Sequence, residues 1–235
     1  MDGSRVAGST ATRILDAAES LFSQRGYHGV SIREVAARSS TELSLTRYHF
    51  GSKDDLFRSV VARRAAPVTR ASFGSLTQAL DANKGKPLSI EAIVRAFVTP
   101  VISLPMLDEG WRHYLKLMIH SDSLADRPDL LEPLRDAYAP VFTCYVNELV
   151  RAGCSRERAS WLMYFIHWML GHAAFEVYEL EKLSAGLCDS TDYETRVDRL
   201  ATFIVGGAHA LHGSSSMGLT AKPPAARKRR TSVHR

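Results

Sequence analysis

The sequence predicts an all-α fold in which a small three-helix head, containing a helix-turn-helix, precedes a larger helical body. Apolar residues recur at a spacing of three and four along most of the 235 residues, and proline and glycine separate these stretches. No stretch alternates apolar and polar residues in the way that is typical of strands. We expect an N-terminal arm, the head, the body and a C-terminal tail over residues 1–11, 12–58, 59–212 and 213–235.

The head begins with a helix whose apolar side chains form one stripe, namely Ile14, Leu15, Ala18, Leu21 and Phe22. Gly26 follows at the point where a left-handed helix end is expected. Ser31 and Glu34 have the spacing of a capping box, so the sequence predicts a second helix over 32–38.

Small hydroxyl residues over 39–41 form a turn before a third predicted helix over 42–49, and Ser52 with Asp55 caps a fourth. Two short helices joined by such a turn make a helix-turn-helix, whose second helix enters the major groove of DNA. Side chains suited to base edges and phosphates occupy the third helix: Leu43, Ser44, Thr46, Arg47, Tyr48 and His49. The alternative is a small solvated helix on an all-helical protein, because helix-turn-helix geometry also occurs outside DNA-binding proteins.

The segment from Ile14 to Phe57 resembles the N-terminal domain of TetR-family transcriptional repressors. The submotifs ILDAAESLF, RGY, SIREVA, RYHF and GSKDDLF follow in the family's order and spacing and cover about a fifth of the chain. The resemblance implies a homodimer that binds a palindromic operator in double-stranded DNA. It also implies release of that operator when a small molecule occupies the C-terminal domain.

The resemblance assigns DNA contacts to the following residues: Ser31, Arg33, Leu43, Ser44, Leu45, Arg47, Tyr48, His49 and Lys53. The chain departs from the family where the usual Ala-Gly-Val-Ser becomes Ser39-Ser40-Thr41-Glu42, so the turn lacks its glycine and a capping serine. Arg47 stands where tyrosine is common, and Thr46 stands where leucine usually packs. The operator sequence is therefore not transferable. Glu42 is repulsive near phosphates, but it is favourable in the first turn of a helix or beside a cytosine amino group.

Charge is divided unevenly along the chain. Residues 1–70 hold 11 Lys and Arg against 7 Asp and Glu, residues 71–212 hold 13 against 18, and residues 213–235 hold 6 against none. A basic head on an acidic body fits a protein that touches phosphates at one end. The basic run 227–230 lies in a tail expected to be disordered; either it adds phosphate contacts or it is solvated without a role.

Composition indicates a cytoplasmic regulator rather than a secreted or membrane protein. Hydrophobic residues make up 45% of the chain, and no stretch resembles a signal peptide or a membrane span. Cys144, Cys154 and Cys188 are odd in number and widely spaced, so we interpret them as core residues in a reducing compartment. His113 and His120 can share a helix face, but no acid-rich ligand set accompanies them, and we expect no metal, no cofactor and no enzymatic activity.

Seven helices are predicted after the turn that follows the third helix, over 52–66, 68–83, 88–104, 109–122, 128–152, 156–183 and 191–212. The helix over 156–183 is apolar around most of its circumference, so it must be covered on more than one side. With the last helix it predicts a four-helix dimer interface. The residues assigned to that interface are Gly171, Ala174, Gly206, Gly207 and Leu211. The alternative is a buried central helix in a monomer.

Large aromatic residues and methionine concentrate in the body and predict a pocket for an apolar or aromatic effector. The residues assigned to this pocket are Phe97, Trp111, Tyr114, Met118, Phe142, Tyr145, Trp161, Tyr164, His167 and Trp168. His113, His167 or a tyrosine hydroxyl would orient the effector. The same spacing is also typical of an ordinary hydrophobic core.

The sequence thus favours a ligand-responsive transcriptional repressor. A DNA-binding accessory or architectural protein without effector control is the second hypothesis. A helical carrier or enzyme with a vestigial head is the third, and only the unusual turn residues Ser40 to Glu42 favour it.

Overall fold

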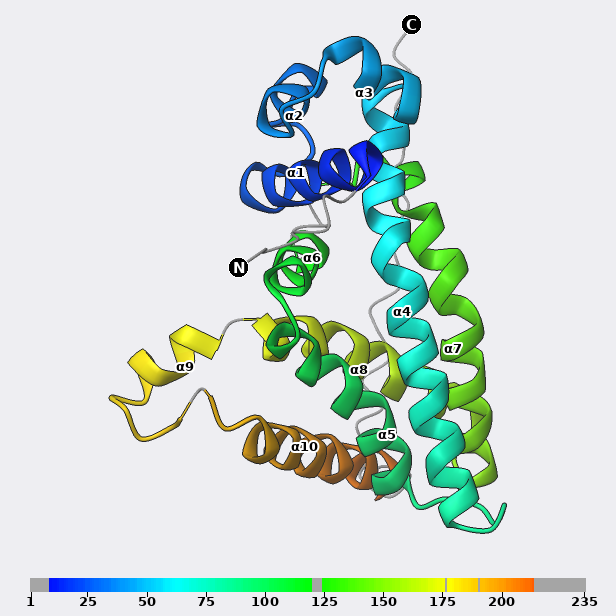
Figure 1. The fold of residues 1–235 in the computed structure, drawn as a ribbon. Coiled ribbons are helices and arrows are strands. Elements are labelled where there is room, and N and C mark those ends of the chain that lie inside the picture. The colour runs from blue at the N-terminus through cyan, green and yellow to red at the C-terminus, as the bar shows by residue number, and fades with distance from the viewer. Residues whose placement is uncertain (1–8, 120–123, 176, 190, 214–235) are drawn as a thin grey trace, which may run out of the picture.

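The computed structural model describes residues 9–119, 124–175, 177–189 and 191–213, and all regular elements within these ranges are helices (Figure 1). The predicted all-α fold is confirmed. In chain order the elements are α1 (Thr10–Arg25), α2 (Ile32–Arg38), α3 (Leu43–Phe50), α4 (Lys53–Ala82), α5 (Ile90–Ser103), the 3-10 helix η1 (Leu104–Met106), α6 (Glu109–Ile119), the 3-10 helix η3 (Pro128–Leu131), α7 (Glu132–Arg151), α8 (Arg156–Phe175), α9 (Val177–Leu183) and α10 (Tyr193–Gly213). In the described ranges, none of these helices has the length and apolarity needed to cross a membrane.

Helices α1 to α3 and the first turns of α4 form a head at one end of the molecule (Figure 1). Its core contains Phe22 and Phe57, whose rings meet edge to face at 5.1 Å. Leu117, Leu124 and Leu130 come from the body and are buried in the same cluster. Body residues therefore form part of the head core, so a movement of the body can be transmitted to the head.

Helix α4 runs without interruption from the head down the length of the body, beside α7 (Figure 1). The predicted division into helices over 52–66 and 68–83 is wrong, because Pro67 lies inside the helix. Proline removes one backbone hydrogen bond from a helix. Burial of Ala65, Val68 and Ser72 on either side of it maintains the helix across this point. The expected boundary at residue 58 therefore lies within one continuous helix.

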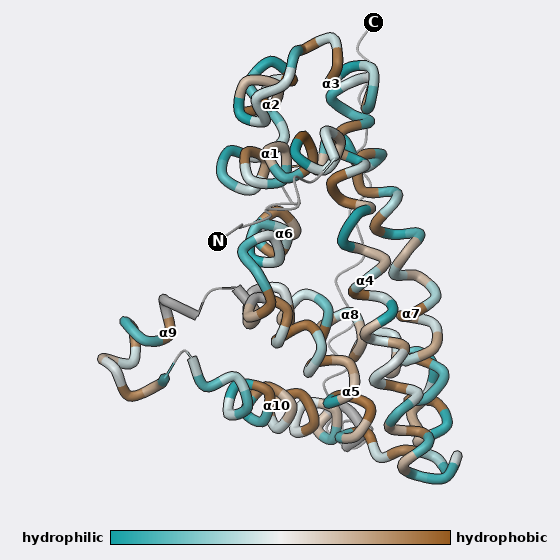
Figure 2. Tube along the Cα trace, in the orientation of Figure 1, coloured by the Kyte–Doolittle hydropathy of each residue, from teal (hydrophilic) through white to brown (hydrophobic). Residues whose placement is uncertain are grey.

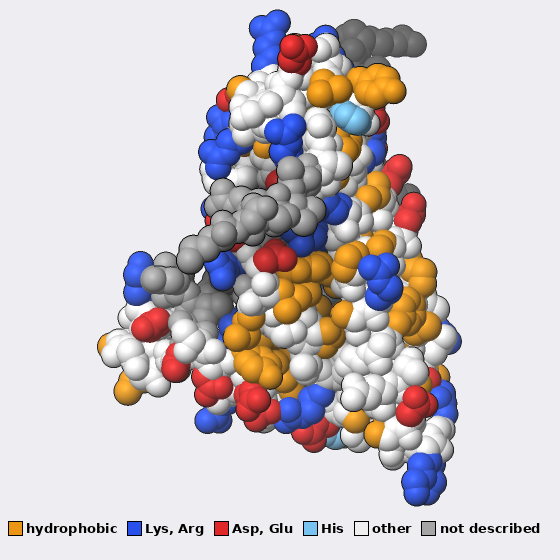
Figure 3. All heavy atoms as spheres, in the orientation of Figure 1, with side chains coloured by type: hydrophobic (Ala, Val, Ile, Leu, Met, Phe, Trp, Pro, Cys, Tyr) orange, Lys and Arg blue, Asp and Glu red, His pale blue; other side chains and the backbone are white. Residues whose placement is uncertain are grey.

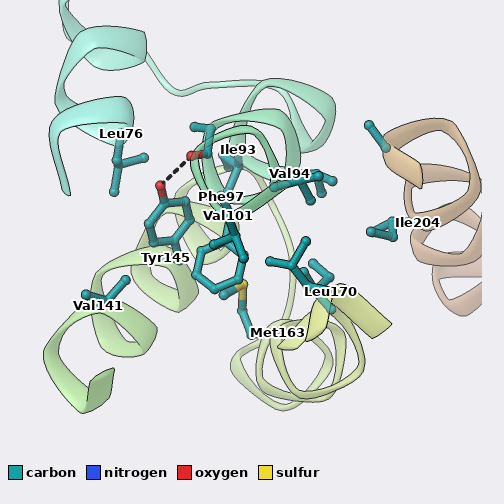
Figure 4. Packing of buried hydrophobic residues seen from close by; sticks show 14 of the residues in the cluster. Leu76, Ile93, Val94, Phe97, Val101, Val141, Tyr145, Met163, Leu170 and Ile204 are labelled. Atoms are coloured by element: carbon teal, nitrogen blue, oxygen red, sulfur yellow. Dashed lines mark hydrogen bonds between the residues drawn. The ribbon is translucent and has the colours of Figure 1, made fainter. Parts of the chain in front are cut away.

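The body core forms where α5 packs against α4, α7, α8 and α10. Phe97 of α5 and Tyr145 of α7 meet edge to face at 4.8 Å, and the Tyr145 hydroxyl lies 3.0 Å from the Ala96 carbonyl oxygen (Figure 4). Leu170 and Ile204 extend the cluster toward α8 and α10. Hydrophobic residues recur between hydrophilic ones along α5 and α10 (Figure 2), as expected of helices that bury one side.

Several predicted boundaries need correction. The helix expected over 156–183 is α8 followed by α9, and the chain expected to be helical from 128 begins with the 3-10 helix η3. The arm expected over 1–11 is shorter, since Ser9 caps α1 with its hydroxyl and Thr10 is already helical. Residues 1–8 and nearly all of the predicted tail lie outside the described ranges.

The cysteines do not all behave as predicted. Cys154 is buried and Cys144 is half-buried, whereas Cys188 is exposed. The prediction that Cys188 fills the core is wrong, because the chain after α9 runs along the surface.

Candidate DNA interface and effector pocket

Helix α2 begins with the predicted capping box. The Ser31 hydroxyl accepts from the Glu34 backbone N–H at 3.3 Å, and the Glu34 carboxylate accepts from the Ser31 backbone N–H at 2.7 Å. Arg25 of α1 donates to the same carboxylate at 2.8 Å. Hydrogen bonds from the Ser31 side chain and backbone, then from Arg25, lower the pKa of Glu34 to about 2. This network fixes the start of α2, and Arg33 beside it is exposed.

The turn between α2 and α3 uses serine where a glycine is usual. Ser40 has φ 52°, a left-handed conformation that costs a residue with a side chain about 1 kcal/mol or more. The Thr41 N–H donates to the Ala36 carbonyl at 2.9 Å and closes the end of α2. The turn therefore keeps the required backbone geometry without glycine.

Beneath this turn, the hydroxyl of Thr46 takes the place of the leucine side chain that usually packs there. Thr46 is fully buried, and its hydroxyl lies 3.1 Å from the Thr41 hydroxyl and 3.2 Å from the Glu42 carbonyl oxygen. Ser39 extends the chain, with its hydroxyl 2.8 Å from that of Thr41. A buried hydroxyl is tolerated when it is hydrogen bonded. The departures from the family pattern at Ser39, Thr41 and Thr46 therefore fit together, because their hydroxyls are linked by hydrogen bonds.

Helix α3 presents most of its predicted DNA-facing side chains to solvent. Ser44, Leu45, Arg47, Tyr48 and His49 are exposed, Tyr48 at 84%, while Leu43 is half-buried. Figure 3 shows Lys and Arg side chains gathered on the head.

Glu42 stands just before α3 as its N-cap residue. Its carboxylate accepts from the Ser44 hydroxyl at 3.2 Å and makes no hydrogen bond with the helix backbone. A negative charge here is favourable to the helix dipole.

At the start of α4, Lys53 is held against the head. Its Nζ atom lies 4.2 Å from the centre of the Tyr27 ring, and burial lowers its pKa. Tyr27 also donates to Asp54, the next residue of α4. The predicted phosphate contact is thus a lysine whose position is set by an aromatic ring.

A first ion cluster joins the head to the body through Glu19 of α1. Arg64 of α4 donates to both carboxylate oxygens of Glu19, at 3.0 and 3.1 Å, and Glu19 is 2% exposed. The Arg64 guanidinium also lies 4.7 Å from the centre of the Trp111 ring on α6 and 3.7 Å from Asp108. A Cβ atom at Gly110 would lie 1.8 Å from this guanidinium, so α6 approaches Arg64 very closely.

A second cluster centres on Arg127, between α6 and α7. Arg127 donates to Asp54 at 2.5 Å and to Asp129 at 3.0 Å, and Arg58 of α4 donates to Asp129 at 2.6 Å. The Arg127 hydrogen bond lowers the pKa of Asp129 to about 2, and hydrogen bonds from Tyr27 and Arg127 lower the pKa of Asp54. The beginning of α4 is thereby tied to the body beside the candidate phosphate contact.

The body contains a cavity of about 110 Å³ bounded by α5, α6, α7 and α8. Its lining residues are Phe97, Val101, Tyr114, Leu115, Met118, Leu134, Tyr138, His167, Trp168, Leu170 and Gly171. None of them carries a carboxylate, an ammonium or a guanidinium group. Among the described lining residues, the titratable groups are two phenols and one imidazole.

The structure brings five of the ten predicted pocket residues to this cavity: Phe97, Tyr114, Met118, His167 and Trp168. Trp111 is buried beneath Arg64, Tyr145 is buried in the core, and Phe142 packs against that core. Trp161 and Tyr164 are 53% and 48% exposed on the outer side of α8. The pocket assignment of these five residues is corrected, because they lie one or two helical turns away from the residues that line the cavity.

Tyr138 and the aliphatic lining residues were not assigned to the pocket from the sequence. These aliphatic residues are Val101, Leu115, Leu134 and Leu170. Nothing in helical spacing separates a cavity wall from a packed core, since both are apolar and buried.

Some of the residues predicted at the dimer interface are exposed, and others are not. Ala174 is 1% exposed in the core of its own chain, so its assignment to the interface is corrected, and Gly171 lines the cavity. Gly206 and Gly207 are exposed on α10 with open space beyond them. The side chain of Leu211 lies outside the described residues.

The outer side of α8 is an exposed aromatic face, and three of its four residues were assigned to the pocket from the sequence. It presents Trp161, Tyr164, Phe165 and Trp168, which recur at three-to-four spacing. That spacing was visible in the sequence, but so was a second apolar stripe on the opposite side.

Among the described residues, no group of three or more His, Cys, Asp or Glu side chains is arranged to hold a metal ion. His113 lies 3.8 Å from Glu109 on its own helix, and His120, its suggested companion, is outside the described ranges.

The hydrogen-bonded turn between α2 and α3, the exposed polar and aromatic side chains of α3 and the position of Lys53 are those of a DNA-binding protein of the helix-turn-helix class. The family model described as "Bacterial regulatory proteins, tetR family" matches residues 14–60, and that described as "Tetracyclin repressor-like, C-terminal domain" matches residues 95–207. The chain belongs to the TetR family of transcriptional regulators, which bind DNA and are not enzymes.

Similar proteins agree with this assignment. The chain is 43% identical over 60 residues to an HTH-type transcriptional repressor of Mycobacterium tuberculosis and to an HTH-type transcriptional regulator of Mycobacterium bovis. The match spans 26% of this chain and 32% of each relative, so only about a third of their length is covered.

Solved structures share the fold over most of the chain. The fatty acid degradation regulator FadR from Bacillus halodurans has a TM-score of 0.59 at 13% identity, covering 85% of this chain and 96% of that one. A TetR-like transcriptional regulator from Rhodococcus sp. RHA1 has a TM-score of 0.58 at 18% identity, covering 87% and 96%. At this identity the likeness is one of fold.

Proposed function

We propose that the protein is a repressor that binds a palindromic operator as a homodimer and releases it when a small, mainly apolar molecule occupies the body cavity. The observation that carries this proposal is the continuity between the cavity wall and the head. Tyr114 lines the cavity and meets Trp111 edge to face at 6.0 Å on the same helix. Trp111 lies beneath Arg64, which is paired with the buried Glu19 of α1.

This chain of contacts supports mechanical coupling. A ligand that displaces α6 moves Trp111 against Arg64, and α1 follows because the Glu19–Arg64 pair resists separation in a buried setting. The second ion cluster at Arg127 holds the first turn of α4 to the body. A shift of the body relative to either cluster changes the placement of α3, and a ligand with different affinity for the two placements changes operator binding.

Exposed apolar residues on α8 and α10 support the homodimer. The α8 aromatic face is matched on α10 by Phe203, which is 70% exposed, and by Gly206 and Gly207. Large aromatics and flat glycine surfaces are suited to close packing between two copies of one patch. A dimer has two α3 helices, one for each half-site of a palindromic operator.

The dimer is tested by sedimentation of the purified protein. Phe203→Arg places a charge in the proposed interface and is expected to give a monomer with weakened operator binding. Leu187→Arg is the matched control, since Leu187 is 89% exposed outside α8 and α10. A dimer that survives Phe203→Arg unchanged contradicts this interface.

Effector control is tested by fluorescence anisotropy of a labelled operator during titration with small apolar compounds. Gly171→Leu fills part of the cavity wall and is expected to retain operator binding while losing release. Gly74→Leu is the control, because Gly74 is exposed on α4 with open space around it. If cavity-binding compounds leave operator affinity unchanged, the architectural hypothesis is favoured instead.

A further inference from the structure

The cavity contains a buried hydroxyl without a hydrogen bond of normal geometry to any described residue. Tyr114 is 1% exposed, and its hydroxyl oxygen makes no hydrogen bond of normal geometry with any described residue. A buried hydroxyl normally has a partner, and leaving one without it is costly. The Tyr138 phenol lies in the same cavity wall and is its hydrogen-bonding neighbour, although the contact between the two hydroxyls falls outside normal hydrogen-bond geometry.

The described residues that line the cavity are uncharged at neutral pH. Burial raises the pKa of Tyr114 well above its ordinary value and that of Tyr138 to about 12, so both phenols keep their protons. Partial removal from water lowers the pKa of His167, which therefore stays neutral. The two charged groups that act on the Tyr114 pKa, Glu19 and Arg64, are paired with each other.

A ligand charge would therefore enter this cavity without a counter-charge, at a large desolvation cost. A neutral acceptor can enter without that cost, and it gives the Tyr114 hydroxyl a well-placed acceptor in place of the poorly aligned Tyr138 phenol. The rest of the wall is aliphatic and aromatic and suits an apolar body.

We propose that the effector is an uncharged molecule with a compact aromatic or aliphatic body and one hydrogen-bond-accepting oxygen, such as a ketone or ester carbonyl, which accepts from the Tyr114 hydroxyl. Acids, phosphates and amines of the same shape are excluded from the site. This inference rests on the proposed effector function and narrows it to one chemical class.

The test uses three probes of matched shape, 2-acetylnaphthalene, 2-ethylnaphthalene and 2-naphthoate, titrated into the full chain without DNA and followed by calorimetry. The ketone is expected to bind about tenfold more tightly than the hydrocarbon, and the carboxylate most weakly. Tyr114→Phe is expected to abolish the preference for the ketone while leaving hydrocarbon affinity unchanged. Tyr164→Phe, on the outer side of α8, is the matched control and keeps the preference.

The proposal is overturned if the carboxylate binds best, if ketone and hydrocarbon bind equally, if none of the probes binds, or if Tyr114→Phe keeps the preference. A thermal melt of the ligand-free protein checks the variant independently. Tyr114→Phe removes an unsatisfied hydroxyl and is expected to raise Tm. Selective ketone binding without operator release would contradict the proposed effector function while confirming the chemical class of ligand that the cavity accepts.

Discussion

Arg127 donates to Asp54 at 2.5 Å, and this bond joins the segment before α7 to the first turn of α4. The neighbouring residue on α4 is Lys53, the candidate phosphate contact, which lies over the Tyr27 ring. Tyr27 itself donates to Asp54. A single carboxylate thus connects the body, the ring that positions the lysine and the beginning of the helix that spans the molecule.

Arg127→Ala is expected to uncouple the body from the head. Effector binding lowers operator affinity by some factor in the unaltered protein. Without the bond to Asp54, we expect that factor to be about threefold smaller. Anisotropy titrations of operator with and without effector measure this coupling. Arg70→Ala, an exposed charge on α4, is the control. Equal coupling in the Arg127 variant and the unaltered protein would remove this cluster from the mechanism.

Glu19→Ala is expected to destabilise the protein strongly. The substitution leaves Arg64 without its bidentate partner in a buried site, and loss of one member of such a pair costs about 3–5 kcal/mol. Glu91→Ala is the control because Glu91 pairs with Arg95 at the surface, where about 0–1 kcal/mol is expected. Urea unfolding of the two variants gives both values. Equal losses would contradict the structural importance of the Glu19–Arg64 pair.

Ser40→Gly is expected to stabilise the protein by about 1 kcal/mol, because glycine adopts the left-handed φ of 52° without the cost of a side chain. Ser40→Ala keeps the Cβ atom and should leave the free energy of unfolding nearly unchanged. Chemical denaturation of both variants separates backbone strain from any role of the hydroxyl. A loss of stability in Ser40→Gly would show that the serine side chain itself matters.

Stability is expected to fall in acid through Glu34. Its pKa is lowered from 4.5 to about 2 in the folded protein, so folding favours the ionised form. The resulting stabilisation is complete above about pH 4.5 and is lost as the pH falls toward 2. Urea unfolding across this range should show a shallower pH dependence for Glu34→Gln than for the unaltered protein. An identical slope would contradict the assigned pKa shift.

The sequence predicted the head well because its signals are local. Capping boxes at Ser31 and Ser52 mark helix starts that the structure reproduces. Long-range packing decided the rest. Burial on both sides of Pro67 overrode its tendency to end a helix, and only the tertiary fold shows that Tyr114 faces a cavity while Tyr145 lies in a packed core.

The buried ion pairs were equally invisible in the sequence. Glu19 and Arg64 are far apart along the chain, and neither belongs to a recognisable motif. Charged residues are ordinarily exposed, so a sequence pattern gives no reason to expect Glu19 at 2% exposure.

The central claim is that α3 reads a specific palindrome in DNA. The most direct measurement is selection of random duplexes by the purified protein at moderate salt, where specific contacts outweigh attraction to phosphates. The account predicts an enriched palindrome for the unaltered protein and loss of that enrichment when Arg47→Ala and Tyr48→Ala are combined. No enrichment by the unaltered protein, or unchanged operator binding by the double variant, would contradict it.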